Sequence, residues 1–214
     1  MATTIWGTSS SWTLTALPLF VWMGEILFRT KLSENLFEGL SPWMQKLPGG
    51  LIHVNVVGCA LFAAISGSSA ATVATVGKMS IPELRKRNYP EKILLGSLAG
   101  SGTLGLLIPP SIILIIYGVT VQESIAKLFV AGIIPGIMIA LIFMSYVILW
   151  SLFNKKQMPN IVNQYSFIDK IKRSGQLIPV IILILSVIGS IYTGIATATE
   201  AASLGVVGAL ILSY

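Results

Sequence analysis

An apolar run over residues 93–121 is interrupted in its middle by two glycines and two adjacent prolines, and this interruption constrains the fold most strongly. Proline lacks the backbone amide hydrogen and glycine disfavours helix, so a helix cannot continue from Gly102 through Pro110. Hydrocarbon cannot satisfy the backbone groups that the break frees, and such a break persists in a membrane only where it is buried in protein or lines a polar cavity. We predict a broken transmembrane helix over about residues 93–121, the device with which secondary transporters bind ions and substrates.

The composition places this broken helix in a lipid bilayer. Of the 214 residues, 54% are hydrophobic and 10% are charged, and the mean hydropathy is +0.84. Residues 128–152 carry no charge and would form a helix of about 37 Å, enough to cross a bilayer core of about 30 Å. The last apolar run, residues 201–214, would span only about 21 Å, so we expect the chain to stop inside a helix. The fold class predicted is an all-α integral membrane protein, a polytopic helical bundle. Further apolar runs cover residues 12–28, 51–65 and 177–192.

The positive charges are placed like topology signals. The formal net charge is +6, but the basic residues lie in short segments between apolar runs, mainly residues 78–92 and 154–176, which we assign to the cytoplasmic side. This pattern argues against a nucleic-acid partner. Residues 29–50 have a weaker basic excess. If they too are cytoplasmic, residues 51–77 enter and leave by one face, as a re-entrant hairpin with its tip at residues 66–69.

The predicted tip is rich in hydroxyl groups. Ser66, Ser68, Ser69 and Thr72 surround the flexible Gly67, and hydroxyls and unwound carbonyls are the hard oxygen ligands that Na⁺ prefers. Helix N-termini at such breaks also favour a bound carboxylate. The alternative is that these small residues only let helices pack closely.

Small residues and hydroxyls recur before the proline break. Gly102, Thr103 and Gly105 precede Pro109 and Pro110. An ordinary kink needs one proline, whereas this combination disrupts several consecutive turns.

Two enzyme hypotheses fail, one on the spacing of its residues and one on a residue type. His53 and a nucleophile at Ser66 or Ser68 suggest an intramembrane serine protease, but thirteen residues of helix separate His53 from Ser66 by about 20 Å. A phosphate-binding loop ending at Lys78 is contradicted by Met79, which stands where a hydroxyl residue belongs. We therefore expect no enzymatic activity.

Three further features have local explanations. Glu25 and Arg29 are four residues apart, which predicts an interfacial ion pair. Thr197 and Glu200 fit a capping box and predict a helix start. Cys59, the only cysteine, lies in an apolar run, and we expect it to serve packing.

Three blocks of the chain resemble a known family, the large membrane (permease) subunit of tripartite ATP-independent periplasmic (TRAP) transporters. Residues 59–69 resemble the family's Ser-Gly-Ser hairpin, residues 105–111 resemble its double-proline break, and residues 192–202 resemble the stretch that opens its second half. Their order and spacing agree over essentially the whole chain. Ala70 and Ala198 stand where many members have proline, which predicts altered local rigidity with the site retained.

The resemblance implies sodium-driven uptake of an organic acid, such as a C4-dicarboxylate or sialic acid, across the bacterial inner membrane. It also implies two partners, a small membrane subunit and a periplasmic substrate-binding protein. The implied fold is an elevator-type transporter of two inverted repeats. Residues 1–192 would hold most of the first repeat and residues 193–214 the start of the second, so the chain is expected to be a fragment that does not transport alone.

Two other functions remain open: another sodium- or proton-coupled anion carrier, and a membrane scaffold that transports nothing. If the chain is part of a transporter, we expect sodium to be the coupling ion and not a tightly held cofactor. The expected site residues are Ser66, Gly67, Ser68, Ser69 and Thr72 for the substrate, Ser66, Ser68, Gly102, Thr103 and Gly105 for the sodium ion, and Pro109 and Pro110 for the structural break.

Overall fold

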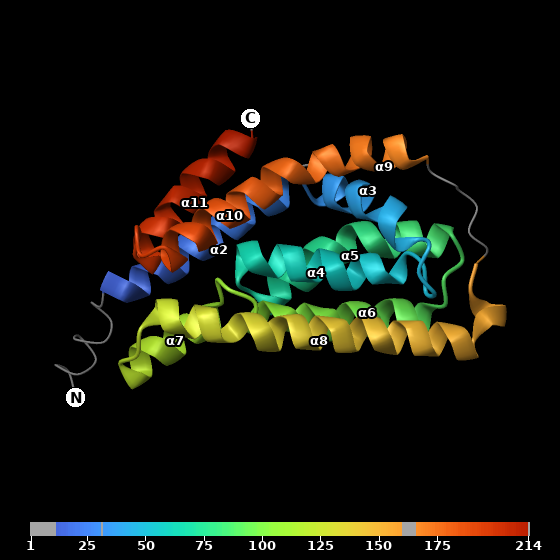
Figure 1. Cartoon of the computed structure of the whole chain (residues 1–214), viewed down its shortest axis with the longest axis horizontal. Coiled ribbons are helices and arrows are strands. Elements are labelled where there is room, and N and C mark those ends of the chain that lie inside the picture. The colour runs from blue at the N-terminus through green and yellow to red at the C-terminus, as the bar shows by residue number, and fades with distance from the viewer. Residues whose placement is uncertain (1–11, 31, 160–165, 214) are drawn as a thin grey trace.

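The computed structural model describes residues 12–30, 32–159 and 166–213, and within these ranges it contains helices and no strands. They form an elongated bundle (Figure 1). The α-helices are α2 (Ala16–Arg29), α3 (Leu32–Met44), α4 (Ile52–Ser66), α5 (Ser69–Lys86), α6 (Glu91–Gly102), α7 (Ile112–Val121), α8 (Ile125–Phe153), α9 (Phe167–Ser174), α10 (Ile178–Tyr192) and α11 (Ala198–Ser213). Short 3-10 turns are η1 (Trp12–Thr15), η2 (Thr103–Leu106), η3 (Lys155–Gln157) and η4 (Gly175–Leu177).

Two helices are long and apolar enough to cross a membrane, α8 and the continuous helical segment Phe167–Tyr192. Along α8, Ile134, Leu141 and Leu149 are 77%, 57% and 56% exposed. A soluble protein would bury such a row, whereas lipid tails solvate it. The membrane-length helix predicted over residues 128–152 is present as α8, which contains Pro135.

The predicted helix break at residues 66–69 is present. Helices α4 and α5 pack side by side and reverse direction at Gly67, whose φ of 59° lies in the left-handed region that glycine tolerates. Ser68 then caps α5 by accepting a hydrogen bond from the amide of Ala71, at 3.4 Å. In Figure 1 this α4–α5 hairpin lies between α3 on one side and α6 with α8 on the other.

The hairpin is longer than its predicted limit at residue 77, because α5 continues to Lys86. Residues 78–86, expected to be part of a loop, are helical. Their Lys, Arg and Glu residues favour helix, and the buried Ser80 and Leu84 pack this turn of α5 against the core. Only the short turn of residues 87–90 connects α5 to α6.

The predicted break in the second helix is also present. Helix α6 ends at Gly102, η2 follows, and α7 begins only at Ile112. The break leans on α8, where a Cβ added at Gly132 would lie 2.6 Å from the carbonyl oxygen of Leu107. Gly132 is seven residues into α8, or about 10 Å along its axis. The break therefore lies beside the membrane-length helix rather than beyond its end.

Two segments that were expected to be connections contain helices. Helix α3 lies within residues 29–50 and buries Leu36, Phe37 and Leu40. Helix α9 lies within residues 154–176 and packs on α3. The indole of Trp43 in α3 donates to Ser174 at 2.7 Å, and the Lys170 ammonium lies 5.3 Å from the Trp43 ring centroid.

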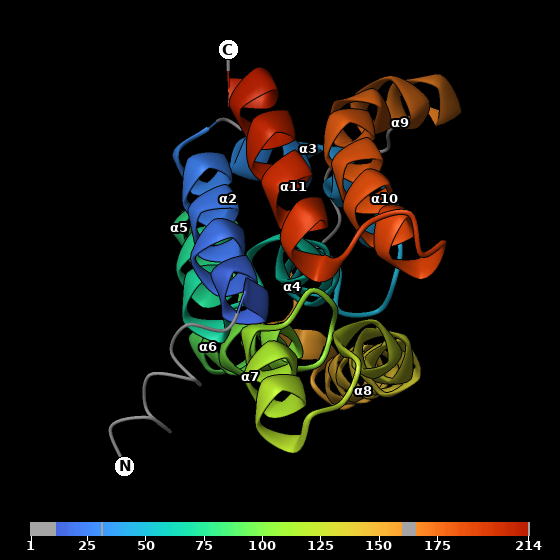
Figure 2. The same ribbon diagram turned by 90° about the vertical axis from the view of Figure 1, so that its left-hand side faces the viewer.

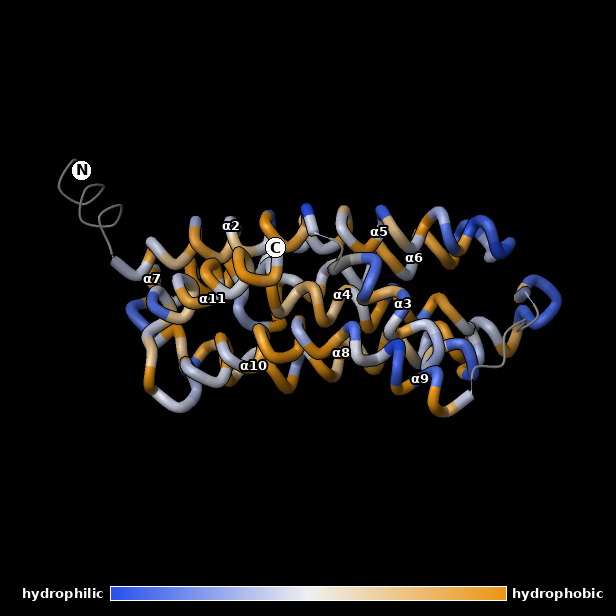
Figure 3. Tube along the Cα trace, turned by 90° about the horizontal axis from the view of Figure 1, so that it is seen from above, coloured by the Kyte–Doolittle hydropathy of each residue, from blue (hydrophilic) through white to orange (hydrophobic). Residues whose placement is uncertain are grey.

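The turn into α4 is held by polar contacts at the charged end of the bundle. Gly49 and Gly50 both have positive φ, and the amide of Leu51 donates to the Tyr89 hydroxyl at 3.0 Å. Burial raises the pKa of Tyr89, which keeps this hydroxyl protonated. In Figure 3 hydrophilic residues gather at the end of the molecule where α5 and α8 finish. This is the arrangement that the charge-based topology requires.

The first and last described helices pack together. Figure 2 shows α11 lying between α2 and α10. Gly205 of α11 contacts the Met23 sulfur of α2 so closely that a side chain there would overlap it. The predicted capping box at the start of α11 is confirmed: the amide of Thr197 donates to Glu200 at 2.8 Å, and the amide of Glu200 donates to the Thr197 hydroxyl at 3.4 Å.

Candidate functional site: a junction of two helix breaks

The tip of the α4–α5 hairpin and the break between α6 and α7 touch each other. The carbonyl oxygen of Gly67 accepts a hydrogen bond from the amide of Ile112 at 3.2 Å. A Cβ at Gly67 would lie 2.5 Å from the Pro110 oxygen, and one at Gly105 would lie 2.9 Å from the Ser69 nitrogen. We call this region, residues 66–72 with residues 102–112, the break junction. Glycine is needed at both positions because the two backbones meet there.

A chain of hydroxyls closes the hairpin side of the break junction. The hydroxyls of Ser66 and Thr72 are 3.0 Å apart, and Thr72 donates to the Ser68 carbonyl at 2.8 Å. Ser66 and Thr72 are almost fully buried, at 1% and 0% exposure. These bonds hold the tip in shape and bring three of the predicted residues together.

Ser69 differs from its neighbours because its hydroxyl oxygen is buried and has no hydrogen-bond partner among the described residues. An unpaired buried hydroxyl is costly. This oxygen therefore stands to gain most from a bound ion or substrate.

The α6 side contributes backbone more than side chains. Gly102 is buried and lies against Val73 of the hairpin. Thr103, predicted as an ion ligand, is exposed, and its hydroxyl donates to the carbonyl of Gly100, in the last turn of α6, at 2.7 Å. Pro109 and Pro110 are buried in the break itself, where Pro110 meets Gly67. The structure thus brings the predicted glycines and prolines to the hairpin but leaves the Thr103 hydroxyl turned outward.

Helix α2 forms a wall of the site that was not expected from the sequence. A cavity of about 150 Å³ is lined by α2 on one side and by the hairpin, with Ser66 and Ser68, on the other. A Cβ at Gly24 of α2 would lie 3.0 Å from the Cα of Ser66. The glycine inside an apolar helix was the available signal, since it allows close approach of another backbone. The remaining lining residues are Val21, Glu25, Phe28, Ala71 and Ala74.

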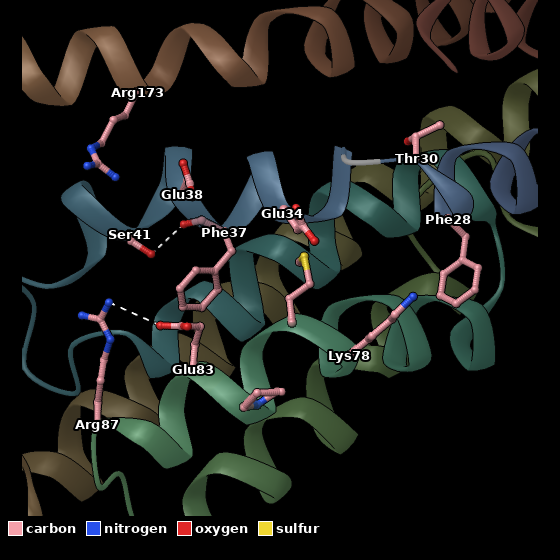
Figure 4. A pocket seen from close by; sticks show the side chains of 12 residues that line it. Phe28, Thr30, Glu34, Phe37, Glu38, Ser41, Lys78, Glu83, Arg87 and Arg173 are labelled. Carbon is pink, nitrogen blue, oxygen red and sulfur yellow. Dashed lines mark hydrogen bonds and ion pairs between the residues drawn. The ribbon is translucent and has the colours of Figure 1, made fainter. Parts of the chain in front are cut away.

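A larger cavity, about 460 Å³, opens at the charged end of the bundle between α3 and α5. Figure 4 shows its charged side chains, which come from α3, α5 and α9 and from the turn that follows α5. This cavity was not expected from the sequence, because α3 and α9 lie in segments that resemble connections. Its charged lining residues are Glu34, Glu38, Lys78, Glu83, Arg87 and Arg173.

The donor set of the break junction suits a hard monovalent cation. In the described part of the chain no three His, Cys, Asp or Glu residues come together as a metal site. The junction instead offers the unpaired Ser69 hydroxyl, with the Ser69 carbonyl oxygen 3.7 Å from the position of a Cβ at Gly102. Neutral oxygens of this kind are the ligands that Na⁺ prefers.

The remaining candidates have structural roles. His53 is fully buried near the start of α4 and contacts the Pro48 carbonyl at 2.8 Å, while Ser66 ends the same helix. The Glu25–Arg29 ion pair is confirmed at 2.8 Å. Cys59 is fully buried in the core, as a packing residue would be.

Two broken helix pairs that meet beside a membrane-length helix define the class: an all-helical membrane protein built around discontinuous helices. The chain belongs to the TRAP transporter family, because residues 1–214 match its sequence profile, described as "Tripartite ATP-independent periplasmic transporter, DctM component". The resemblance predicted from the sequence is confirmed.

Three relatives illustrate the match. The chain is 34% identical to the C4-dicarboxylate TRAP transporter large permease protein DctM of Pseudomonas aeruginosa, over 97% of this chain and 48% of the relative. It is 36% identical to the isethionate TRAP transporter permease protein DctMQ of Oleidesulfovibrio alaskensis, over 94% and 32%. It is 34% identical to the sialic acid TRAP transporter large permease protein SiaM of Vibrio cholerae, over 96% and 48%. The chain thus spans about half the length of these relatives or less.

Proposed function

We propose that this chain supplies part of the transmembrane permease of a secondary transporter that imports an organic acid. The observation that carries the proposal is the break junction: two interrupted helices meet at Gly67, Gly105 and Pro110 beside α8. The buried Ser69 hydroxyl, which has no partner among the described residues, is available there as a ligand.

The substrate is an anion. Helices α5 and α7 both begin at the break junction, at Ser69 and Ile112, and helix N-termini carry partial positive charge. The three relatives described above are named for C4-dicarboxylate, isethionate and sialic acid, all of which are anions near neutral pH, and a fourth is named for ectoine, a zwitterion that also carries a carboxylate. Ser66, Gly67, Ser68, Ser69 and Thr72 would form the part of the substrate site that this chain contributes.

The driving force is a sodium gradient. Na⁺ would bind hydroxyl and carbonyl oxygens of the break junction, from Ser66, Ser68, Gly102 and Gly105, together with the unpaired Ser69 hydroxyl. Thr103 would join them only by a turn of its side chain away from Gly100. Ion binding would stabilise the interrupted backbone and so complete the substrate site, which couples the two ligands.

The family suggests the setting in which this happens. The permease would lie in the bacterial inner membrane as a multi-pass protein, beside a small membrane subunit, and would receive substrate from a periplasmic binding protein. Residues 1–192 would form most of the first inverted repeat of an elevator-type fold, with the α4–α5 hairpin re-entrant, and residues 193–214 would start the second.

The test is carboxylate uptake into proteoliposomes that contain the full-length parent of this chain, the small subunit and the binding protein, with and without an inward sodium gradient. We expect sodium-dependent uptake that falls at least about tenfold in Ser66→Ala. Ser80→Ala is the matched control, because Ser80 is a buried hydroxyl residue of α5 outside the break junction.

Two other results of the uptake assay would each favour a different function. Uptake indifferent to sodium would favour a proton-coupled carrier. Absence of uptake with any candidate acid, in a correctly inserted protein, would favour the alternative of a membrane scaffold that transports nothing.

A further inference from the structure

The two cavities are neighbours along one face of α5. Phe28 lines both of them. On α5, Ala71 and Ala74 line the smaller cavity, while Lys78 and Pro82 line the larger. These four residues follow one another at spacings of three and four, so they lie on one face of the helix. We call the two cavities together, from Ser66 and Ser68 to Arg87, the α2–α5 groove.

At Phe28, the residue that the two cavities share, one cationic side chain lies over the ring. The Lys78 ammonium lies 5.2 Å from the centroid of the Phe28 ring, and Figure 4 shows the two facing each other at one side of the larger cavity. Within residues 12–30, 32–159 and 166–213, no carboxylate forms an ion pair with Lys78. The ammonium is therefore held by a ring face, which is a weaker partner than an anion at the same distance.

The larger cavity, at the charged end, has a lining of both charge signs. Its volume is about 460 Å³, against about 150 Å³ for the cavity at the hairpin tip. In the larger cavity Arg87 is paired with Glu83 at 3.5 Å, and Glu34 and Glu38 line the opposite wall on α3. Such a mixed lining does not retain an anion, because its acidic groups repel what its basic groups attract.

We propose that the α2–α5 groove is the path by which the anionic substrate passes between the break junction and the charged end, with the Phe28–Lys78 pair as its gate. A carboxylate that reaches Phe28 forms an ion pair with the Lys78 ammonium and so draws it off the ring. The Phe28 ring then rotates, and the anion passes into the larger cavity. This inference rests on the proposed function and adds to it a route and two positioning residues.

The first test is the proteoliposome uptake assay, applied to Lys78→Gln and to Ala74→Phe, which fills the smaller cavity. Lys78→Gln removes the charge that attracts the anion at the gate, and Ala74→Phe removes space in the smaller cavity. We therefore expect both variants to lower the maximal rate of uptake at least about fivefold. The concentration of loaded binding protein needed for half-maximal uptake should stay unchanged. Lys86→Gln is the matched control, since Lys86 is an exposed lysine of the same helix that lines neither cavity.

The outcomes separate the route from the function. Normal uptake by both variants, in a system whose wild type shows sodium-dependent uptake, would overturn the groove and leave the proposed function standing. A wild type without uptake would remove the proposed function and the inference together.

Accessibility gives a second readout that does not depend on uptake. In the full-length parent with its native cysteines replaced, Ala74→Cys should react with a membrane-impermeant maleimide applied from the charged end. Phe28→Ala should speed this reaction and added substrate should slow it. A rate unaffected by Phe28→Ala would show that Phe28 does not gate the groove.

Discussion

The Gly67 backbone decides whether the break junction can form. Its φ of 59° disfavours any side chain, and a Cβ on this residue would lie only 2.5 Å from the Pro110 oxygen. We expect Gly67→Ala to lower the free energy of unfolding by about 2–3 kcal/mol, from the left-handed conformation and the clash together. Thermal unfolding of the purified full-length parent measures this.

Gly189 of α10 supplies the control. A Cβ there meets no atom within 4 Å, so Gly189→Ala should leave the unfolding temperature unchanged or raise it slightly. Equal destabilisation by the two substitutions would contradict the role assigned to Gly67.

The Ser69 hydroxyl should report ion binding directly. If Na⁺ takes this oxygen as a ligand, replacing KCl with NaCl should stabilise the protein, by about 2.7 kcal/mol at a concentration one hundred times the Kd. Ser69→Ala should lose most of this sodium-dependent stabilisation, which a thermal shift measurement detects.

Ser80 is a close control for Ser69. Both are serines of α5 with a buried, unpaired hydroxyl, but Ser80 lies outside the break junction. A sodium response lost equally in Ser69→Ala and Ser80→Ala would assign the effect to general packing.

Among the helices, the break between α6 and α7 depends on two consecutive prolines. Changing Pro109 and Pro110 together to Ala restores amide hydrogens and helix propensity. We expect α7 to lengthen towards its N-terminus, the Ile112 amide to leave Gly67, and uptake to fall at least about tenfold while the protein still inserts.

Pro179 tests whether any proline would have this effect. It lies in the first turn of α10, where proline is tolerated because the amide has no partner there. Pro179→Ala should keep uptake within about twofold of wild type. A comparable loss in Pro179→Ala would mean that the double substitution acts through stability alone.

The positions of the breaks could be predicted from the sequence because Gly67 and the Pro109–Pro110 pair act on their own backbone. The contact between the breaks could not. The hydrogen bond from Ile112 to Gly67 joins residues 45 positions apart, and no local sequence pattern indicates a contact between residues so far apart. Helices α3 and α9 were missed because charged residues in short amphipathic helices resemble loop composition.

The cavities show the same limit. Gly24 signals a close approach of some backbone, and Phe28 looks like an ordinary residue of an apolar helix, but their place in the site depends on how α2 packs against the hairpin. The hydroxyl cluster at the tip was recognisable, but the outward turn of Thr103 was not, because its bond to Gly100 competes with any ligand.

For the whole molecule, the topology predicts which ends share a side of the membrane. With the native cysteines replaced, Lys46→Cys, Lys86→Cys and Lys156→Cys should react with an impermeant thiol reagent from one side. Glu123→Cys, in the turn between α7 and α8 at the opposite end, should react only from the other. Labelling of Lys46→Cys from the Glu123 side would contradict the re-entrant hairpin.

The packing of α2 against α11 has a consequence for biosynthesis. Met23 and Gly205 touch but are separated by about 180 residues of chain, and at about 5–20 residues per second a ribosome needs roughly 10–40 s to make that length. Throughout this interval α2 lacks α11, the helix with which it makes its most extensive packing contact. We therefore expect the face of α2 that α11 covers to stay open, to lipid or to the insertion machinery, until α11 emerges, and a stall in translation after α10 would leave that face open to wrong partners.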